Sequence, residues 1–420
     1  MKVTKTIIAS GVALLVLQSS CMDGTGPGDQ SNGRLSITNN PFVLAAQVRY
    51  FDLDIPIQTS GVGYSASSGP AFSITPLSAS RLTAPPSIKL KLVAEVDPPS
   101  IGGQVLQATA VTITGTLAVV SYNMRGAQYL GAIDVIDISN PKKPVLRSRA
   151  LFQNADVNGI STDGVNVYAA EASGDTSFQS PGAFEAVLLS GTNLILNGDH
   201  RSALSSFAGT STAVAGSRVF ATSGDGGSLF AFDMPTWTST TVGLHDARWV
   251  DVAAGKVAVV QGTPGQLAVF NAADLSALGT FPFTGADVAE SKSTVQLVGG
   301  KAFVAAGSGG VQVLSASTGL VVGSVPRPDA ASLGLDPSVV VTNAASVDDD
   351  LLFISNGEAG VYVAQGSQPF SATGSETAQQ ITMLGRLGFD ALQSVNHVAY
   401  QAGNLFIAAG LGGLKIVRVN

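Results

Sequence analysis

The sequence predicts an all-β chain whose folded part is a seven-bladed β-propeller of four-stranded blades. Three observations support this prediction. A glycine-rich hairpin motif recurs between runs of alternating apolar and polar residues. The chain has 420 residues, more than one compact core usually holds. The last copy of the motif lacks a final strand, whereas an extra strand precedes the first copy. Self-similarity at about 40–50 residues built only from strands is typical of propeller blades.

Composition narrows the possible partners. Charged residues make up 12% of the chain, its net charge is −7, and it has 48 glycines, as expected of many tight turns. No run of lysine and arginine is present, so the sequence argues against a nucleic-acid partner.

The first residues are typical of an export signal. Lys2 and Lys5 precede an apolar run at 7–17 that is too short to span a bilayer comfortably. Small residues then lead to Cys21, the only cysteine. This arrangement resembles a bacterial lipoprotein signal, although Gln18 stands where that family usually has leucine. We expect 1–20 to be a signal peptide and Cys21 to be the lipidation site; the alternative is an ordinary secretory signal with Cys21 incidental.

Residues 21–85 are rich in Gly, Ser and Pro and are interpreted as a tether between the anchor and the fold. Within them, 34–58 alternate apolar and polar residues, as a few short strands would. The sequence leaves open whether 34–58 form a small folded cap or part of a long stalk.

The hairpin motif appears twice in nearly the same form, as AAGSGGVQVL at 305–314 and AAGLGGLKIV at 408–417. Alternation on both sides of a short glycine turn is a strong hairpin signal. We expect each motif to be the turn between the second and third strands of a blade, with glycine supplying positive φ. Seven copies are recognised, at 111–136, 157–188, 212–232, 249–270, 294–314, 344–364 and 396–417.

The ends of the repeat array predict how the ring closes. The seventh copy ends at Asn420, directly after its third strand, and 88–96 form an unassigned strand before the first copy. We expect 88–96 to pair with 414–419 as the fourth strand of the last blade, because an open ring would expose a sheet edge. The propeller then covers 86–420.

One turn points to a repeat family. Asp137, Ser139, Asn140, Pro141 and Pro144 in GAIDVIDISNPKKP match the closing turn of LVIVD repeats, and this chain is similar to bacterial surface lipoproteins that carry them. Other copies resemble the looser turns of YVTN-type and quinoprotein propellers. The resemblance implies a propeller at the bacterial cell surface or outer membrane and implies no single chemistry.

Chemical signatures are few. There is no nucleophile elbow, phosphate-binding loop or cysteine pair, and the three histidines, His200, His245 and His397, are scattered along the sequence. The sequence therefore predicts no catalytic residue, no metal site and no cofactor.

The longest hairpins predict a binding face. In a propeller, the hairpins between strands two and three share a face with the loops that link blades. Two of these hairpins are enlarged, at 121–130 and 171–184, and a third segment starts the fourth inner strand. Tyrosine and arginine are enriched in binding hot spots. The candidates are Tyr122, Arg125, Tyr129, Glu171, Asp175, Phe178, Arg248 and Trp249; the alternative is ordinary variable loops, with Trp249 in the core.

These observations favour an exported, lipid-anchored and monomeric scaffold of the bacterial cell envelope, without catalysis. Its partner would be an envelope or extracellular protein or glycan. As an outer membrane lipoprotein it would face either the periplasm or the surface. Two alternatives stay open: a lactonase-like or quinoprotein-like enzyme with its site at the channel mouth, and a purely structural envelope protein.

Overall fold

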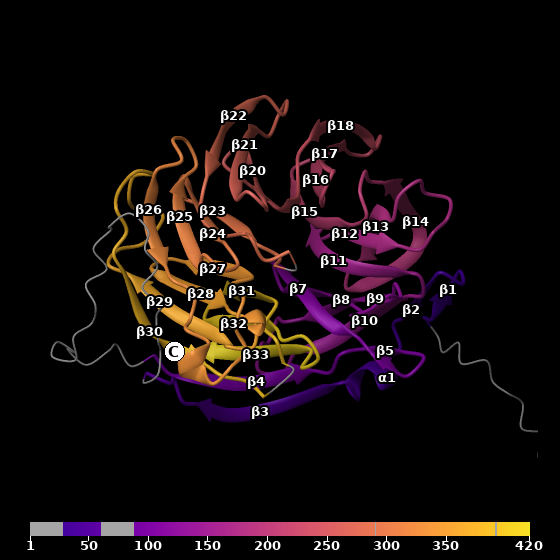
Figure 1. Ribbon diagram of the computed structural model, residues 1–420. Coiled ribbons are helices and arrows are strands. Elements are labelled where there is room, and N and C mark those ends of the chain that lie inside the picture. Colours follow the sequence, from indigo (N-terminus) through magenta and orange to yellow (C-terminus); the bar gives the residue numbers. More distant parts are fainter. Residues whose placement is uncertain (1–27, 60–87, 290, 391–392) are drawn as a thin grey trace, which may run out of the picture.

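The computed structural model describes residues 28–59, 88–289, 291–390 and 393–420, and confirms the predicted propeller. Seven sheets surround a central axis, and the strands of each blade follow one another outward (Figure 1). Helix within these ranges is limited to α1 (Pro41–Ala45) and the 3-10 turns η1 (Ala331–Leu333) and η2 (Pro337–Val339). In this part of the chain no helix has the length and apolar character needed to cross a bilayer.

Every blade is an antiparallel meander whose first strand lines the axis. Blade 1 comprises β7 (Gln107–Thr114), β8 (Leu117–Asn123), β9 (Gly131–Asp137) and β10 (Val145–Phe152). Blade 2 comprises β11 (Ala155–Thr162), β12 (Asn166–Ser173), β13 (Gly182–Ser190) and β14 (Asn193–Ala203). Blade 3 comprises β15 (Gly209–Ala215), β16 (Arg218–Ser223), β17 (Ser228–Asp233) and β18 (Thr238–Gly243). Blade 4 comprises β19 (Ala247–Ala253), β20 (Lys256–Gln261), β21 (Gln266–Asn271) and β22 (Ala277–Pro282).

Blade 5 comprises β23 (Val295–Val298), β24 (Lys301–Ala305), β25 (Val311–Ser315) and β26 (Val321–Val325). Blade 6 comprises β27 (Ala344–Asp348), β28 (Leu351–Ser355), β29 (Val361–Gly366) and β30 (Ile381–Leu387). Blade 7 comprises β31 (His397–Gln401), β32 (Asn404–Ala408), β33 (Leu414–Val419) and β4 (Leu90–Val96). A small hairpin, β5 (Ser100–Ile101) with β6 (Gln104–Val105), lies between β4 and β7 along the chain.

The two ends of the propeller sequence pair in the predicted way. β4 runs antiparallel to β33, in a register that places Leu414 opposite Val96 and Val419 opposite Leu90. At the second pair of this ladder, next to Leu414, Lys415 forms a largely buried ion pair with Glu95. The strand from the start of the propeller therefore completes the last blade and closes the ring (Figure 1).

The repeated glycine motif makes contacts both within its own blade and with the next. Gly307 and Gly310 in one copy, and Gly410 and Gly413 in the other, all have positive φ. The first glycine of each copy also forms an isolated bridge to the blade that follows: Gly307 to Thr342, and Gly410 to Ala108. A Cβ at Gly410 would lie 3.0 Å from the Ser394 carbonyl oxygen, so the motif requires glycine for close approach as well as for φ.

The segment that the sequence left open is folded and is not a stalk. β1 (Gln30–Ser31) and β2 (Leu35–Thr38) extend blade 1 beyond β10, and β3 (Val48–Ile55) extends blade 7 beyond β4. α1 lies between β2 and β3 along the chain, and its Leu44 is buried. The predicted signal peptide, Cys21, and the parts of the predicted tether at 22–27 and 60–85 lie outside the described residues.

A ring of polar contacts joins the inner strands. At six of the seven junctions a side chain at the start of one inner strand donates to a main-chain carbonyl leading into the next blade; at the seventh, Thr294 N–H donates to the Asn343 carbonyl. The six donor–acceptor pairs are Thr109–Val157, Asn158–Gly209, Thr210–Ala247, Arg248–Val288, Asn343–Val395 and Asn396–Ala108. These bonds fix the spacing of the blades around the axis, while apolar side chains pack between the faces of neighbouring sheets.

The closing register can be tested by cross-linking. Lys91 stands opposite Arg418, and directly paired residues lie within the Cα separation that a disulfide spans. In a Cys21→Ser background, Lys91→Cys with Arg418→Cys should oxidise to a disulfide and raise the free energy of unfolding by about 2–5 kcal/mol. Urea unfolding with and without reductant measures the change.

The matched control is Lys91→Cys with Val417→Cys, since Val417 pairs with Leu92 and its side chain points to the opposite face of the sheet. A disulfide in this control and none in the first variant would place β33 one residue out of register.

Candidate functional site

The two enlarged hairpins lie where the sequence predicted them, over blades 1 and 2. Arg125 is exposed, and Tyr129, Asp175 and Phe178 are partly exposed. Two other candidates are buried: Tyr122 in β8 and Glu171 in β12 have no exposed surface. Their inclusion in a docking face was wrong, because both lie inside the strands that precede the turns.

Tyr122 has a packing role in blade 1. Its hydroxyl donates to Asp134 at 2.9 Å, and Arg149 donates to both oxygens of the same carboxylate at 2.7 Å. Burial, together with the charge of Asp134, raises the pKa of Tyr122 well above its usual value. The phenol therefore stays neutral and acts as a donor within the blade.

A buried carboxylate holds the blade 1 hairpin. One oxygen of Asp156, at the start of β11, accepts the N–H groups of Met124 and Leu130 at 3.1 Å each. Burial raises the pKa of Asp156 to about 6, and these two bonds act in the opposite direction. Because Met124 and Leu130 stand at the two ends of the loop, one side chain of blade 2 fixes the shape of a loop of blade 1.

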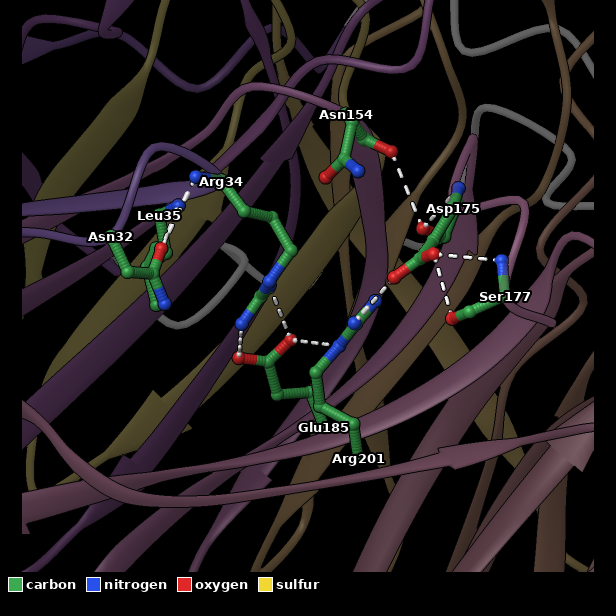
Figure 2. Close-up of polar contacts among 9 residues, drawn as sticks. Asn32, Arg34, Leu35, Asn154, Asp175, Ser177, Glu185 and Arg201 are labelled. Carbon is green, nitrogen blue, oxygen red and sulfur yellow. Dashed lines mark hydrogen bonds and ion pairs between the residues drawn. The ribbon is translucent and has the colours of Figure 1, made fainter.

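The blade 2 hairpin is fixed by an arginine on the outermost strand of that blade. Arg201 in β14 forms ion pairs with Asp175 at 2.7 Å and with Glu185 at 3.1 Å (Figure 2). Its guanidinium carbon lies 4.8 Å from the centre of the Phe178 ring. The hydrogen bond from Arg201, followed by those from Ser177, lowers the pKa of Asp175 far below its usual value. Both functional candidates in this loop, Asp175 and Phe178, are thus held against one guanidinium.

Arg34 brings the N-terminal segment into the same cluster. Its guanidinium donates to both oxygens of Glu185, at 2.7 and 2.8 Å, and Figure 2 shows Arg34 and Arg201 approaching this carboxylate together. Glu185 has no exposed surface. The sequence reasoning missed Arg34, Glu185 and Arg201, although a charged residue inside the apolar run AFEAVLL was a usable signal.

Glu171 is the remaining member of this buried group. It is fully buried, and neither of its oxygens has a hydrogen-bond partner among the residues that the structure describes. Burial, and then the charge of Glu185, raise the pKa of Glu171 well above its usual value of 4.5. Burial therefore favours the neutral form of Glu171, which belongs to the scaffold beneath the hairpin.

An exposed aromatic side chain extends the surface toward blade 3. Phe207, in the loop between β14 and β15, is 61% exposed. The loop is joined to the blade 2 hairpin, because Gly182 N–H donates to the Ser206 carbonyl at 3.0 Å and Ser180 Oγ donates to the Leu204 carbonyl at 2.6 Å. We call the surface formed by Arg125, Tyr129, Asp175, Phe178 and Phe207 the loop platform.

The third predicted segment does not belong to this platform. Arg248 is only 6% exposed, donates twice to Asp246 at 3.0 and 2.7 Å, and donates to the Val288 carbonyl at 2.8 Å. Trp249 turns toward the axis, where its ring stacks on His397 at 5.2 Å between centroids. Their proposed place on a docking face was wrong: Arg248 joins two blades, and Trp249 lines the channel.

The channel contains a cavity of about 380 Å³ that runs along the inner strands. Near the start of these strands, the Lys292 ammonium lies 5.6 Å from the Trp249 ring centre and donates to the Asn158 carbonyl at 2.6 Å. Burial lowers the pKa of Lys292 to about 8, whereas the pKa of His397 falls to about 3 through burial and the nearby Lys292 charge. Trp249 of blade 4, Lys292 of blade 5 and His397 of blade 7 therefore lie across the channel, at the end on the same face as the loop platform.

No group of three or more His, Cys, Asp and Glu side chains in the described ranges is placed to hold a metal ion.

No protein-family model matches this chain, and no match is found among curated proteins. Among solved structures, the chain is similar to the crystal structure of BamB from Moraxella catarrhalis, with a TM-score of 0.46 and 12% identity over 91% of this chain and 97% of that chain. Similarity at this level does not bear on function, and the propeller assignment rests on the sheets themselves.

Replacement of the ionisable Glu171 by a neutral amide should stabilise the protein at neutral pH. With its folded-state pKa raised, Glu171 costs stability as pH rises from 4.5 toward that folded value, because the unfolded chain ionises first. Glu171→Gln should therefore match the wild type near pH 4 and exceed it at pH 7 by at least about 1 kcal/mol. Urea unfolding at both pH values measures this, with Glu376→Gln at an exposed position as the control. A variant that is less stable than wild type at pH 7 would contradict the assignment.

The channel bridge predicts a coupled titration. Lys292→Met removes the charge that helps to depress the pKa of His397, so the His397 midpoint should rise from about 3 but stay below its usual value, since burial remains. NMR titration of the three histidines measures it. His200 serves as the internal control, because burial alone lowers its pKa. An unchanged His397 midpoint would show that the Lys292 charge does not act on His397.

Proposed function

We propose that this protein is an exported, lipid-anchored scaffold of the bacterial cell envelope that binds a protein partner through the loop platform. The main support for the proposal is that partly exposed aromatic and charged side chains occupy two enlarged hairpins whose shapes are fixed by charged side chains beneath them. Asp156 holds the first hairpin, and Arg201 together with Glu185 holds the second. A loop ordered before binding loses less conformational entropy when a partner docks. The platform therefore offers a preorganised surface.

The chemistry of the platform favours a protein partner. Tyr129, Phe178 and Phe207 provide partly or largely exposed aromatic area, and Arg125 provides an exposed cation. Aromatic residues and arginine are the usual anchors of protein interfaces. Arg201 is already bound to two carboxylates, so the acidic side chain of Asp175 is neutralised locally and does not repel an acidic partner.

The platform is a better candidate than the channel for this role. Lys292, Trp249 and His397 bridge the channel at the platform end, and the remaining cavity of about 380 Å³ suits a small molecule and no protein segment of interface size. The enlarged hairpins lie outside this bridge and are open to a large partner.

Export and anchoring form part of the proposal on sequence grounds. The charged start, the short apolar run and Cys21 support a lipoprotein signal, and the closing turn of blade 1 supports the resemblance to LVIVD-repeat surface lipoproteins. Cys21→Ser should then release the protein from the membrane fraction, and mass spectrometry of the wild type should show acylated Cys21 at the mature N-terminus.

Site-specific photo-crosslinking in producing cells tests the platform. A photoreactive amino acid at Phe207 or Arg125 should give a discrete crosslinked protein band. The same residue at Val165, which is 57% exposed in the turn between β11 and β12 on the opposite face, should give none. Phe178→Ala should weaken the Phe207 crosslink at least about fivefold, as loss of an interface anchor does.

The fold of each variant is checked by its thermal unfolding midpoint. Equal crosslinking from Val165 and Phe207, or an unchanged Phe207 crosslink in Phe178→Ala, would remove the platform as the binding site even if Cys21 proves to be acylated.

A further inference from the structure

We propose that the rim of the propeller around α1 contacts the surface of a lipid bilayer, with Phe42 and Val43 inserted among the headgroups. The proposal rests on the lipid anchoring at Cys21 proposed above. It adds a second membrane contact, made by the folded body itself.

The first observation is exposure. Phe42 is 89% exposed and Val43 is 54% exposed, and Phe42 has the most exposed large apolar side chain in the described ranges. The exposure follows from the way α1 is built. Asn40 caps the helix by accepting the Phe42 N–H at 3.0 Å, and Leu44 turns inward, so the first turn must project Phe42 and Val43 outward.

The second observation is the position of this turn relative to Cys21. Gly28 is fixed to the fold, because its carbonyl accepts from Asn39 Nδ2 at 3.2 Å. Phe42 follows three residues after Asn39 and so lies within about 10 Å of it. The seven residues from Cys21 to Gly28 can span at most about 25 Å. An acyl chain on Cys21 would therefore hold this rim, and not the far side of the ring, next to the bilayer.

The third observation is the chemistry around the turn. α1 packs against β10, and the segment leading into β10 carries the exposed Lys142 and Lys143. Tyr50, 54% exposed, lies beside them and donates its hydroxyl to the Pro144 carbonyl at 3.1 Å. Apolar and aromatic side chains flanked by lysines suit an interface with anionic headgroups. Two acids near the turn, Asp52 and Asp97, are paired with Lys91 and Arg49, respectively, at 2.7 Å each.

A single probe beside Phe42 tests the contact. Cys21 is the only native cysteine, and acylation would block its thiol, so Val43→Cys in the full chain provides one reactive site; where Cys21 proves not to be acylated, Val43→Cys is labelled in the Cys21→Ser background. An environment-sensitive fluorophore at this position should brighten roughly twofold or more with vesicles of phosphatidylethanolamine and phosphatidylglycerol, and brominated lipids should quench it. The same label at Leu278→Cys, an exposed position on the outer strand of blade 4 across the ring, should show neither change. Phe42→Ser added to Val43→Cys should reduce the brightening by at least about half.

The acylation state of each sample, read by mass, separates this proposal from the anchoring proposal. An acylated chain whose probe at 43 stays in water would overturn the rim contact and leave the anchor intact. A chain without acylation whose probe still enters lipid would support the rim contact and overturn the anchor, whereas a chain without acylation and with its probe in water would overturn both. A signal that rises with protein concentration in the absence of vesicles would assign the patch to a second copy and overturn the membrane contact.

Discussion

The pairing of β4 with β33 is the constraint on which the rest of the molecule depends. Each of the seven sheets packs mainly against its two neighbours, so an open joint would free the first and last blades together. The joint combines a full antiparallel ladder with a buried ion pair between Lys415 and Glu95. β3 then covers the outside of β4, which makes the closing strand an interior strand. The strand that closes the ring is therefore hydrogen-bonded to a neighbouring strand along both of its edges.

Polar contacts distribute the same constraint around the axis. One bond to a main-chain carbonyl contributes about 1 kcal/mol net, so the contacts at the seven junctions contribute several kcal/mol together. Their more important effect is geometric, since a donor at the start of each inner strand, a side chain at six junctions and a main-chain N–H at the seventh, fixes the distance to the next blade. The repeated Gly307 and Gly410 add main-chain bridges to the following blade, and both have the positive φ that glycine adopts readily.

The repeat, the blade number and the closing strand were predictable because each follows from local signals: period-two alternation, glycine turns and an unpaired strand at each end. The loop platform was only partly predictable. Sequence position identified the enlarged hairpins, yet Tyr122 and Glu171 proved to be buried because alternation does not reveal where a strand stops and its loop starts. Arg34 could not have been connected with Glu185, since 151 positions separate them and the N-terminal segment gave no sign that it crosses to blade 2.

That long-range contact gives the N-terminal segment a role beyond covering sheet edges. Arg34 reaches the carboxylate that also binds Arg201, and Arg201 in turn holds Asp175 and Phe178. A well-packed apolar group could stabilise such a site equally well, because burying ions costs about as much solvation as their attraction returns. Directional ion pairs differ from apolar packing in that they fix one geometry. Their presence beneath an exposed hairpin is therefore better explained by the need to hold Asp175 and Phe178 in one position than by stability alone. Through Arg34, the N-terminal segment is bonded directly to the base of the surface proposed to bind a partner.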